Sequence, residues 1–485
     1  MFLGIDLGTS SVKALLLTRD GRVAGEASAA YPVLAPRPGW AESEPADWWE
    51  AAATAVRALV ERHGSAVEGV GLSGQMHGVV LASASGAPLR PAVLWADGRA
   101  RAEVAAYARL PAEMRYRLGN PPAGGMAGPT LAWLETHEAG TYAAARWALQ
   151  PKDWLRLRLT GVAAAEPSDA SATLMYDLTK DAWADDVVHA LGLRPDLLAP
   201  LMPSAGVAGT LTPAAAHRLG LAAGTPVAAG AADTAAAALG SGLVAPGPMQ
   251  LTVGSGAQIV TLVEEARVDP SGRSHLLRTA QAHGHYAMAA MQNAGLALEW
   301  ALRVLGVSWA EAYAAAFAVP AGAEGVTFLP YVTGERTPHF DPDAGGGWSG
   351  LRLGHGREHL LRAAFEGVAF SLRQGLGVLS DLGYDAESLR LAGGGTIEPA
   401  WRQLLADVLG RPLLATDVPS ASARGAAILA GLALGEFPDE GAACAGLAEP
   451  QLVAVPAGAD PALDDAYARF LQQYPASAAR RPNRE

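Results

Sequence analysis

The chain has 485 residues and a formal net charge of -12, and half of its residues are apolar. This apolar content excludes an intrinsically disordered chain, and the length exceeds what one hydrophobic core usually covers, so we expect two domains. With a pI of about 5.4 the chain carries no broad basic surface, which argues against a nucleic-acid partner. A phosphate group would have to be bound locally, by backbone amides and a cation.

Cys444 is the only cysteine, which excludes an intramolecular disulfide and a cysteine-based metal site. The opening residues Met1–Asp6 lack a basic segment and place an acid inside the apolar stretch, unlike a signal peptide. The longest Ala-rich run, Pro226–Leu239, contains Asp233 and is too short to span a bilayer. We therefore expect a cytoplasmic protein with no membrane partner.

Strands and helices alternate in the first half of the chain. The apolar pattern predicts strands at Phe2–Ile5 and Val12–Leu17, joined by a glycine-containing turn, and a third strand from Arg22. Two further strands are expected at Glu68–Leu72 and Val79–Leu81. Helices are expected at Trp48–His63, Arg99–Leu110, Thr130–His137 and Lys152–Leu159. This alternation favours an α/β fold.

Glycine and proline cluster at Gly240–Pro248, and we expect the domain boundary here, between residues 1–243 and residues 244–485. The strand–turn–strand pattern of the N-terminus then returns in weaker form. Strands are expected at Met249–Val253, Ala257–Val263 and Leu389–Leu391, and helices at Arg357–Leu379 and Glu398–Leu409.

The first candidate site is the turn that follows the first strand, with the sequence Asp6-Leu7-Gly8-Thr9-Ser10-Ser11. A strand that ends in Asp and enters a tight glycine turn exposes backbone amides to a phosphate. Asp6 would then bind Mg²⁺, directly or through water. An ordinary hairpin whose polar side chains satisfy the turn amides explains the same pattern equally well.

Asp233 is the second candidate, a lone carboxylate at the end of an apolar run that opens an Ala-rich helix. Such a group is expensive to bury unless it is used. A plain helix N-cap is the competing explanation, and the local pattern alone favours it. A helix N-terminus also predicts a low pKa for this carboxyl group.

Two further glycine turns lie in the second half of the chain. One, after a predicted strand, contains Thr252, Gly254, Ser255 and Gly256, and it offers amides and hydroxyls. The other, Gly393–Gly395, would let a nucleotide approach the backbone. Each signal is weak alone, because glycine turns are frequent in a chain with 56 glycines.

A group of polar and aromatic residues in the first half has the character of a polyol site, with directional hydrogen-bonding groups and a flat apolar wall. Its members are Gln75, Met76, His77, Trp95, Asp97 and Arg99. A buried structural histidine and a surface Asp–Arg pair are the alternative. The glycines that lie close to His77 on both sides favour the binding site.

The order of these motifs along the chain carries a resemblance to a known family. The matching stretches are GIDLGTSSVK, GLSGQMHG, LWADGR, PKDWLRLRLTG, EPSDASATLMYDL, AAGAADTAAAALGSG, FLPYVTGERTPHFDP, EGVAFSLRQGL and GGGTIEPAW. On them the chain resembles the FGGY carbohydrate kinases. Met76 and His77 in GLSGQMHG are typical of the D-xylulose kinases within this family.

The resemblance implies two domains of the actin/hexokinase-like ribonuclease-H fold, with the sugar and ATP meeting in the cleft between them. It implies transfer of a phosphoryl group from ATP to D-xylulose, giving D-xylulose 5-phosphate, with Mg²⁺ as cofactor. Asp233 would be the base on the sugar hydroxyl, and Asp6 would lie on the side of the metal and the phosphates. Met76 and His77 would contact the sugar.

The resemblance also implies where the nucleotide binds. The terminal phosphates would lie at Gly8, Thr9 and Ser10, with Lys13 nearby. Thr252 and Gly254–Gly256 would form a second phosphate loop, and Gly393–Gly395 would line the nucleotide. Thr396, Ile397 and Glu398 depart from the residues usual in the family after the triple glycine, so the adenine contacts there stay open.

Two alternatives accompany this interpretation. The acceptor could be another sugar or polyol, such as L-ribulose, another ketose or glycerol, because a few pocket contacts decide selectivity. A nucleotide-switch ATPase of the actin or chaperone type, with no sugar acceptor, is the alternative from another class. The sequence also leaves open whether the chain forms a homodimer.

Overall fold

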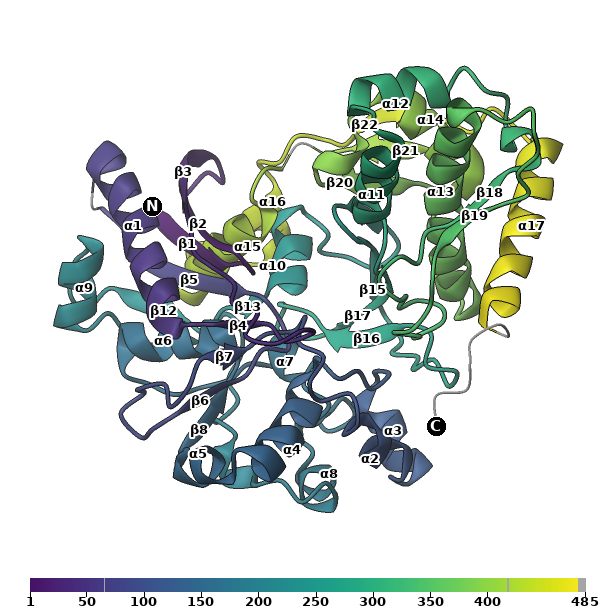
Figure 1. The fold of residues 1–485 in the computed structure, drawn as a ribbon. Helices are drawn as coiled ribbons and strands as arrows, with labels where there is room; N and C mark the ends of the chain where they lie inside the picture. Colours follow the sequence, from purple (N-terminus) through teal and green to yellow (C-terminus); the bar gives the residue numbers. More distant parts are fainter. Residues whose placement is uncertain (65, 417, 479–485) are drawn as a thin grey trace. The chain divides into compact units, whose positions relative to one another are not determined.

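The computed structural model describes residues 1–64, 66–416 and 418–478. The chain divides into two compact units. Figure 1 shows the ribbon, coloured by position along the sequence. The first unit contains Met1–Val244, Leu276–Tyr286 and Val418–Leu447, and the second contains the remaining segments. The assignment of sugar binding to residues 1–243 and of nucleotide binding to residues 244–485 stays a prediction.

A mixed sheet with the strand order β11-β12-β5-β1-β2-β3 forms the centre of the first unit, and β13 also pairs with β5. The predicted N-terminal hairpin is present as β1 and β2, and β5 lies parallel to β1. The strands of this unit are β1 (Phe2–Leu7), β2 (Ser11–Leu17), β3 (Val23–Ala30), β4 (Glu42–Ser43), β5 (Gly69–Gly74), β6 (Val80–Ala82), β7 (Ala92–Val93), β8 (Trp147–Leu149), β9 (Tyr176–Asp177), β10 (Ala182–Trp183), β11 (Val207–Thr210), β12 (Pro226–Ala228) and β13 (Ala231–Ala232).

One face of this sheet packs against α1 (Pro45–His63), a helix that the sequence predicts within a few residues. Alternation along β1 sends Leu3 and Ile5 to this face, where they share a core with Trp48 of α1. All three side chains are fully buried. The N-terminal apolar pattern is therefore explained by the packing of one sheet face.

The opposite face packs against α15 (Ala421–Ala433), a helix from the far end of the chain (Figure 1). A Cβ atom on Gly4 would lie 1.8 Å from the carbonyl oxygen of Ala423, and one on Gly71 would lie 1.8 Å from that of Ala426. Only glycine on β1 and β5 allows so close an approach of helix and sheet.

The predicted helices of the first unit are confirmed with one exception. The chain from Arg99 to Leu110 was expected to be helical, but only α2 (Val104–Ala108) is. The carboxylate of Asp97 accepts a hydrogen bond from the backbone amide of Arg99, and this bond holds a turn where the helix was expected to begin. The other helices are α3 (Ala112–Leu118), α4 (Ala127–His137), α5 (Ala139–Ala144), α6 (Pro151–Thr160), α7 (Pro167–Ala170), α8 (Asp185–Ala190), η1 (Pro195–Leu197), α9 (Pro213–Leu219), α10 (Asp233–Gly240) and α16 (Glu440–Cys444).

The second unit repeats the arrangement of a hairpin beside a parallel strand. Its sheet contains the order β17-β15-β14-β20-β21-β22, in which β14 pairs antiparallel with β15 and parallel with β20. The strands are β14 (Met249–Val253), β15 (Ala257–Val263), β17 (His285–Met291), β18 (Thr327–Leu329), β19 (Gly347–Ser349), β20 (Leu389–Ala392), β21 (Leu413–Ala415) and β22 (Gln451–Ala454). The short strand β16 (His275–Arg278) belongs, apart from His275, to the first unit. The three strands predicted here are confirmed.

The long predicted helix of the second unit is present as α13, whose apolar residues are buried over most of its length. The helices of this unit are α11 (Gly295–Leu305), α12 (Trp309–Ala316), η2 (Ala323–Gly325), α13 (Arg357–Asp381), η3 (Gly394–Thr396), α14 (Pro399–Leu409) and α17 (Pro461–Ala478). Within the described parts of the chain, no helix combines the length and the apolar character that crossing a membrane requires.

Candidate active site

Asp6 and Asp233 lie on either side of the end of β5. In the register of the sheet, Asp6 of β1 is opposite Ser73 on one side, and Ala231 of β13 is opposite Ser73 on the other. Asp233 follows β13 directly and is the first residue of α10. The topology therefore brings two carboxylates that are 227 positions apart (233 minus 6) to one edge of one sheet.

Both carboxylates are partly exposed, and their pKa values are raised. Burial, and then the charge of Asp6, raise the pKa of Asp233 to about 7, although bonds from the amide and hydroxyl of Thr234 oppose the shift. The low pKa expected for Asp233 from the helix N-terminus is therefore wrong, because desolvation and a like charge outweigh the helix dipole.

The pKa of Asp6 is raised for the same first reason, its burial against the strand ends. The hydroxyl of Ser73 donates to Oδ1 at 3.0 Å and, together with the positive charge of Lys13, lowers this pKa in part. Lys13 lies opposite Asp6 on β2 with an exposed side chain. This charge environment differs from that of Asp233, whose pKa is raised further by the negative charge of Asp6.

Side chains from distant segments hold the first glycine turn. The carbonyl oxygen of Gly8 accepts hydrogen bonds from the hydroxyl of Tyr31 and, at 3.2 Å, from Nε2 of Gln75. Its amide donates to the carbonyl of Ser11 at 3.0 Å, which closes the turn. Gln75, expected at the sugar, is buried and bonds to the turn, and its Oε1 has no hydrogen-bond partner among the described residues.

Trp95, Thr9 and Ser10 lie around the same turn. The indole Nε1 of Trp95 donates to the hydroxyl of Thr9 at 3.0 Å, so the predicted sugar wall and the predicted phosphate turn lie together in this unit. Trp95 and Thr9 are partly exposed and Ser10 is exposed. These groups are accessible to a ligand at the end of β1.

Met76 and His77 follow β5 directly. Met76 is buried, whereas His77 is half-buried and adopts a φ of 70°, a backbone conformation that is uncommon for a residue with a side chain. Nδ1 of His77 lies 2.9 Å from the carbonyl oxygen of Ala172. Strain of this kind clusters at functional sites, and here the contact with Ala172 fixes the direction of the imidazole.

Asp97 and Arg99 form a buried ion pair rather than a surface pair. Both side chains are 1% exposed, and the guanidinium of Arg99 contacts Asp97 at 2.7 Å and Glu42 at 2.6 Å. It also stacks over the ring of Trp40, 3.6 Å from the ring centre. These contacts occupy both groups within the unit, and their contact with a sugar stays a prediction.

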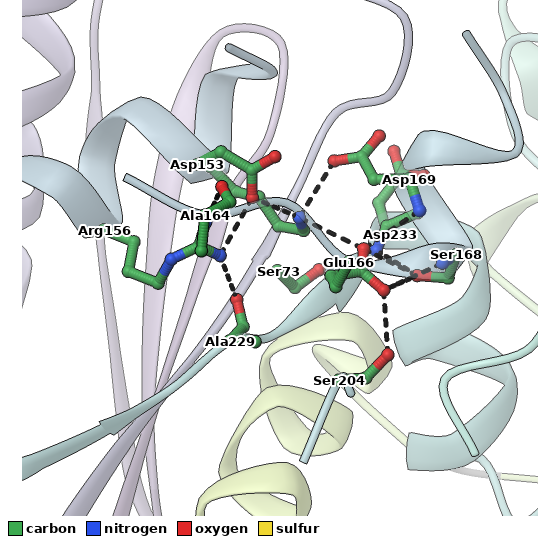
Figure 2. Close-up of polar contacts among 12 residues, drawn as sticks. Ser73, Asp153, Arg156, Ala164, Glu166, Ser168, Asp169, Ser204, Ala229 and Asp233 are labelled. Atoms are coloured by element: carbon green, nitrogen blue, oxygen red, sulfur yellow. Dashed lines mark hydrogen bonds and ion pairs between the residues drawn. The ribbon is translucent and has the colours of Figure 1, made fainter. Parts of the chain in front are cut away.

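Sequence reasoning missed a buried charged cluster beside Asp233 (Figure 2). Nζ of Lys152 lies 2.6 Å from Asp153, 3.1 Å from Glu166 and 3.1 Å from Asp169. All four side chains are at most 1% exposed. Removing one partner of a buried pair typically costs about 3–5 kcal/mol. The available signal was Lys152 itself, one of only three lysines in the chain, next to Asp153 in the stretch PKDWLRLRLTG.

Charge balance within this cluster depends on Asp169. Burial raises the pKa of Asp169 well above its ordinary value, and the attraction of Lys152 offsets this only in part. Burial opposes the positive charge on Lys152, but the surrounding Asp153, Glu166 and Asp169 outweigh it and raise the pKa of the ammonium. A protonated Asp169 would leave the positive Lys152 and Arg156 balanced by Asp153 and Glu166.

The second glycine turn, in the second unit, is held by main-chain groups. The amides of Gly295 and Leu296, at the start of α11, donate at 2.9 Å to the carbonyls of Gly254 and Ser255. The carbonyls thus face the positive end of the helix. The side chains around the turn are open, since Gly254 and Ser255 are exposed and Thr252 is partly exposed. Gly256 has no room for a Cβ, which would lie 2.7 Å from a carbonyl oxygen.

Glu335 supports this turn and was also missed. Its carboxylate accepts the amides of Gln292, at 2.5 Å, and Arg336, at 2.8 Å, which fixes the segment that leads into α11. Burial raises the pKa of Glu335 to about 7, opposed by these amide bonds. The residue stands in the stretch TGERTP, which marks the family resemblance without suggesting this role.

The triple glycine lies beside the second turn. Because β14 and β20 are parallel with Thr252 opposite Ala392, the loops that follow them share one edge of the sheet. A Cβ atom on Gly393 or Gly395 would lie 2.8 or 2.7 Å from the carbonyl oxygen of Val253, so both positions require glycine. Gly393 also has a φ of 84°. The two predicted nucleotide loops of this unit are thus neighbours.

A magnesium ion that accompanies a nucleotide takes most of its ligands from water and phosphate oxygens and needs only one or two carboxylates. Asp6, partly exposed at the end of β1, fits this sparse ligand set. No ready-made group of three His, Cys, Asp or Glu side chains is found in the described ranges of the chain.

Comparison with known proteins identifies relatives for both units. Residues 1–240 match the model of the FGGY family of carbohydrate kinases, N-terminal domain, and residues 249–434 match that of the C-terminal domain. A xylulose kinase of Escherichia coli (strain K12) is 38% identical over 416 residues, which cover 85% of this chain and 86% of that protein.

Solved structures give the same assignment of the fold. The xylulose kinase from Rhodospirillum rubrum has a TM-score of 0.87 and 33% identity, covering 99% of this chain and 98% of that one. A glycerol kinase from Plasmodium falciparum, solved with ADP, has a TM-score of 0.88 at 19% identity, covering 98% and 97%. The two-domain α/β fold expected from the sequence is confirmed.

Proposed function

This chain belongs to the FGGY family of carbohydrate kinases, and we propose that it transfers the γ-phosphoryl group of ATP to D-xylulose, giving D-xylulose 5-phosphate and ADP. The sugar is supported by the similarity to xylulose kinases over most of the chain. The fold does not select the acceptor, because the similarity to a glycerol kinase is equally strong in shape.

The observation that carries the proposal is the pair of partly exposed carboxylates at the end of β5, one of which has a pKa raised to about 7. A general base works best when its pKa is near the operating pH. Asp233 therefore accepts the proton of the attacking sugar hydroxyl. Its Oδ1 is fixed by the amide of Thr234, and Oδ2 receives the proton.

Met76, His77 and Trp95 bind the sugar in this proposal. His77 offers a ring nitrogen whose direction is set by the contact with Ala172, and Trp95 offers a flat apolar face next to the first glycine turn. Oε1 of Gln75, without a partner among the described residues, accepts a sugar hydroxyl. Asp97 and Arg99 act indirectly, because they fix the segment that carries Trp95.

The turn of Gly8, Thr9, Ser10 and Ser11 binds phosphate oxygens through its hydroxyls and through its amides other than that of Gly8, which closes the turn. Lys13 adds a positive charge beside Asp6. Phosphoryl transfer needs positioning and charge neutralisation more than covalent chemistry, so such groups suffice. Mg²⁺, when bound, neutralises phosphate charge, and Asp6 orients its water ligands.

The second unit binds the nucleotide. The turn of Thr252, Gly254, Ser255 and Gly256 receives phosphate in this proposal, since Gly254 and Ser255 are exposed and their carbonyls are already bonded to the amides of Gly295 and Leu296 at the start of α11. Gly393, Gly394 and Gly395 let the nucleotide lie against the backbone, because these positions are exposed and carry no side chain. ATP as phosphoryl donor is consistent with a cytoplasmic protein.

A phosphorylation assay over a panel of acceptors tests this function. With Mg·ATP in excess, kcat/KM is measured for D-xylulose, L-ribulose, D-ribulose, L-xylulose and glycerol. We expect D-xylulose to exceed every other acceptor by at least about tenfold, the discrimination that one or two pocket contacts supply. A higher kcat/KM for another acceptor would reassign the substrate, and ATP hydrolysis without any acceptor would contradict the kinase.

A further inference from the structure

The segment that leads into Asp233 has no polar or long side chain that could hold it in place. Residues 228–232 read Ala-Ala-Gly-Ala-Ala, and all five are buried. Asp233 itself opens α10 without a side-chain cap at Ala232. The position of the Asp233 carboxylate is therefore set by what the backbone of this segment contacts.

Polar groups from three other segments contact that backbone. The carbonyl oxygen of Ala229 accepts a hydrogen bond from Nη1 of Arg156 at 2.6 Å. The amide of Gly230 donates a hydrogen bond to the carbonyl oxygen of Ser204 at 3.0 Å. The amide of Ala232, next to Asp233, donates to the hydroxyl oxygen of Ser168 at 2.9 Å. Figure 2 shows Ser168 and Ser204 on Glu166, with Arg156 reaching Ala229.

The bond from Ala232 requires that the hydroxyl of Ser168 point elsewhere, and Glu166 provides for this. Oε2 of Glu166 accepts the hydroxyls of Ser168 and Ser204, each at 2.8 Å. Oε1 accepts the amide of Asp169 and faces Lys152. Every group around Glu166 is a donor, so the hydroxyl hydrogen of Ser168 goes to Glu166 and its lone pairs stay available for the amide of Ala232.

Lys152 supports this arrangement of hydrogen bonds around Glu166. Its buried ammonium lies 3.1 Å from Glu166 and is the positive charge nearest to that carboxylate. The ammonium supplies one more donor to Oε1 of Glu166, so both carboxylate oxygens accept and neither competes with the amide of Ala232 for the hydroxyl oxygen of Ser168. The network therefore runs in one direction, from Lys152 through Glu166 and Ser168 to the backbone beside Asp233.

We propose that Ser168, oriented by Glu166 and Lys152, is a positioning residue that fixes Asp233 for proton transfer through the amide of Ala232. The inference rests on the proposed function, in which Asp233 is the base. It assigns a purpose to the stretches PKDWLRLRLTG and EPSDASATLMYDL beyond the packing of the core.

The test compares Ser168→Ala with Ser204→Ala. Both remove a buried hydroxyl that donates at 2.8 Å to the same oxygen of Glu166, but only Ser168 contacts the amide of Ala232. We expect kcat for D-xylulose to fall about 10- to 100-fold in Ser168→Ala, the range in which a general base loses its alignment. Ser204→Ala should stay within about threefold, since its backbone carbonyl still holds Gly230.

Two further measurements separate positioning from loss of structure. The dissociation constant of Mg·ATP and the KM for D-xylulose should change by less than about threefold in Ser168→Ala, because the base acts on kcat. Equal losses in the two variants, or an unchanged kcat in Ser168→Ala, would overturn the inference. If Ser168→Ala fails to fold, Ser168→Cys preserves the volume with a weaker acceptor and should still lose kcat about tenfold.

Failure of the proposed function has a different signature. In that case the wild-type enzyme would not phosphorylate D-xylulose, and the same comparison would be made with the acceptor that the panel identifies. A wild-type enzyme that is active on D-xylulose, together with a normal Ser168→Ala variant, would contradict only the positioning role.

Discussion

The central sheets of the two units have the same strand arrangement at the edge that carries the glycine turns, but the charged residues at these edges differ. In each, a hairpin strand ends in a glycine turn and pairs with a parallel strand: β1 with β5, and β14 with β20. Two residues before the turn glycine, the first edge has Asp6 and the second has Thr252. The first edge also carries a second partly exposed carboxylate, Asp233, whereas Glu335, which supports the second turn, is buried and accepts hydrogen bonds from backbone amides.

The two turns are also held differently. Tyr31 and Gln75 hold the first through side-chain bonds to Gly8. The second is held by the amides at the start of α11, a segment fixed in turn by Glu335. The comparison indicates that the first sheet edge presents reactive side chains to a ligand, whereas the second lets a ligand approach the backbone closely.

The largest effect is expected from Asp233→Asn, which removes the carboxylate that distinguishes the first edge. Without its base, the enzyme should lose about 10³-fold in kcat for D-xylulose. Mg·ATP affinity, measured by calorimetry, should stay within about twofold, because the change affects the sugar side. A kcat within about tenfold of the wild type would exclude Asp233 as the base.

Asp6→Asn should act on the metal instead. We expect the Mg²⁺ concentration for half-maximal rate to rise about 10- to 100-fold, the usual cost of losing a group that orients metal ligands. Ser73→Ala is the matched control, since it removes the 3.0 Å bond to Asp6 but retains the carboxylate. An unchanged magnesium dependence in Asp6→Asn would contradict this role.

At the second edge, the shape of the backbone should matter more than any side chain. Gly393→Ala places a Cβ 2.8 Å from the carbonyl of Val253 at a φ of +84°, whereas a Cβ on Gly394 meets nothing within 4 Å. Strain of about 1–3 kcal/mol should raise the KM for ATP about tenfold in Gly393→Ala. Gly394→Ala should stay close to the wild type, and equal effects of the two would refute the argument.

The pH dependence of kcat/KM tests the electrostatic difference between the two sheet edges. Asp233 must be ionised to act as a base, so kcat/KM should fall as the pH drops below its pKa of about 7. One pH unit below that value the loss should approach about tenfold. In Asp6→Asn this acid limb should move to lower pH, because the charge of Asp6 is one cause of the shift. A limb that stays in place would contradict the coupling.

The smallest effect is expected from Glu335→Gln. The amide keeps the size of the side chain but weakens the bonds to Gln292 and Arg336, so the KM for ATP should rise about threefold. Glu299→Gln, at an exposed position on α11, provides the control and should leave the KM unchanged. A kcat loss without a change in KM would place Glu335 in the chemistry rather than in nucleotide binding.

Local patterns predicted most of the elements because each depends on nearby residues. The alternation of Leu3 and Ile5 and the glycine turn at Gly8 predict a hairpin before any partner is known. The exception, the segment from Arg99, fails because Asp97 forms a turn with it that helical propensity does not represent.

What could not be predicted depends on contacts distant in sequence. The pKa of Asp233 depends on the charge of Asp6. The backbone amide of Ala232, next to Asp233, donates a hydrogen bond to Ser168. Gly4 is required because α15, over 400 residues later, packs on β1. No pattern within a single window contains these partners, and the resemblance to a family supplied the roles of residues without the network that supports them.

The most direct measurement of the central claim is ³¹P NMR of D-xylulose incubated with Mg·ATP and either the wild-type enzyme or Asp233→Asn. We predict equal amounts of ADP and a sugar phosphate monoester with the wild type, and neither in a comparable time with the variant. Free phosphate formed in place of the sugar phosphate, or sugar phosphate formed by Asp233→Asn at the wild-type rate, would contradict the account.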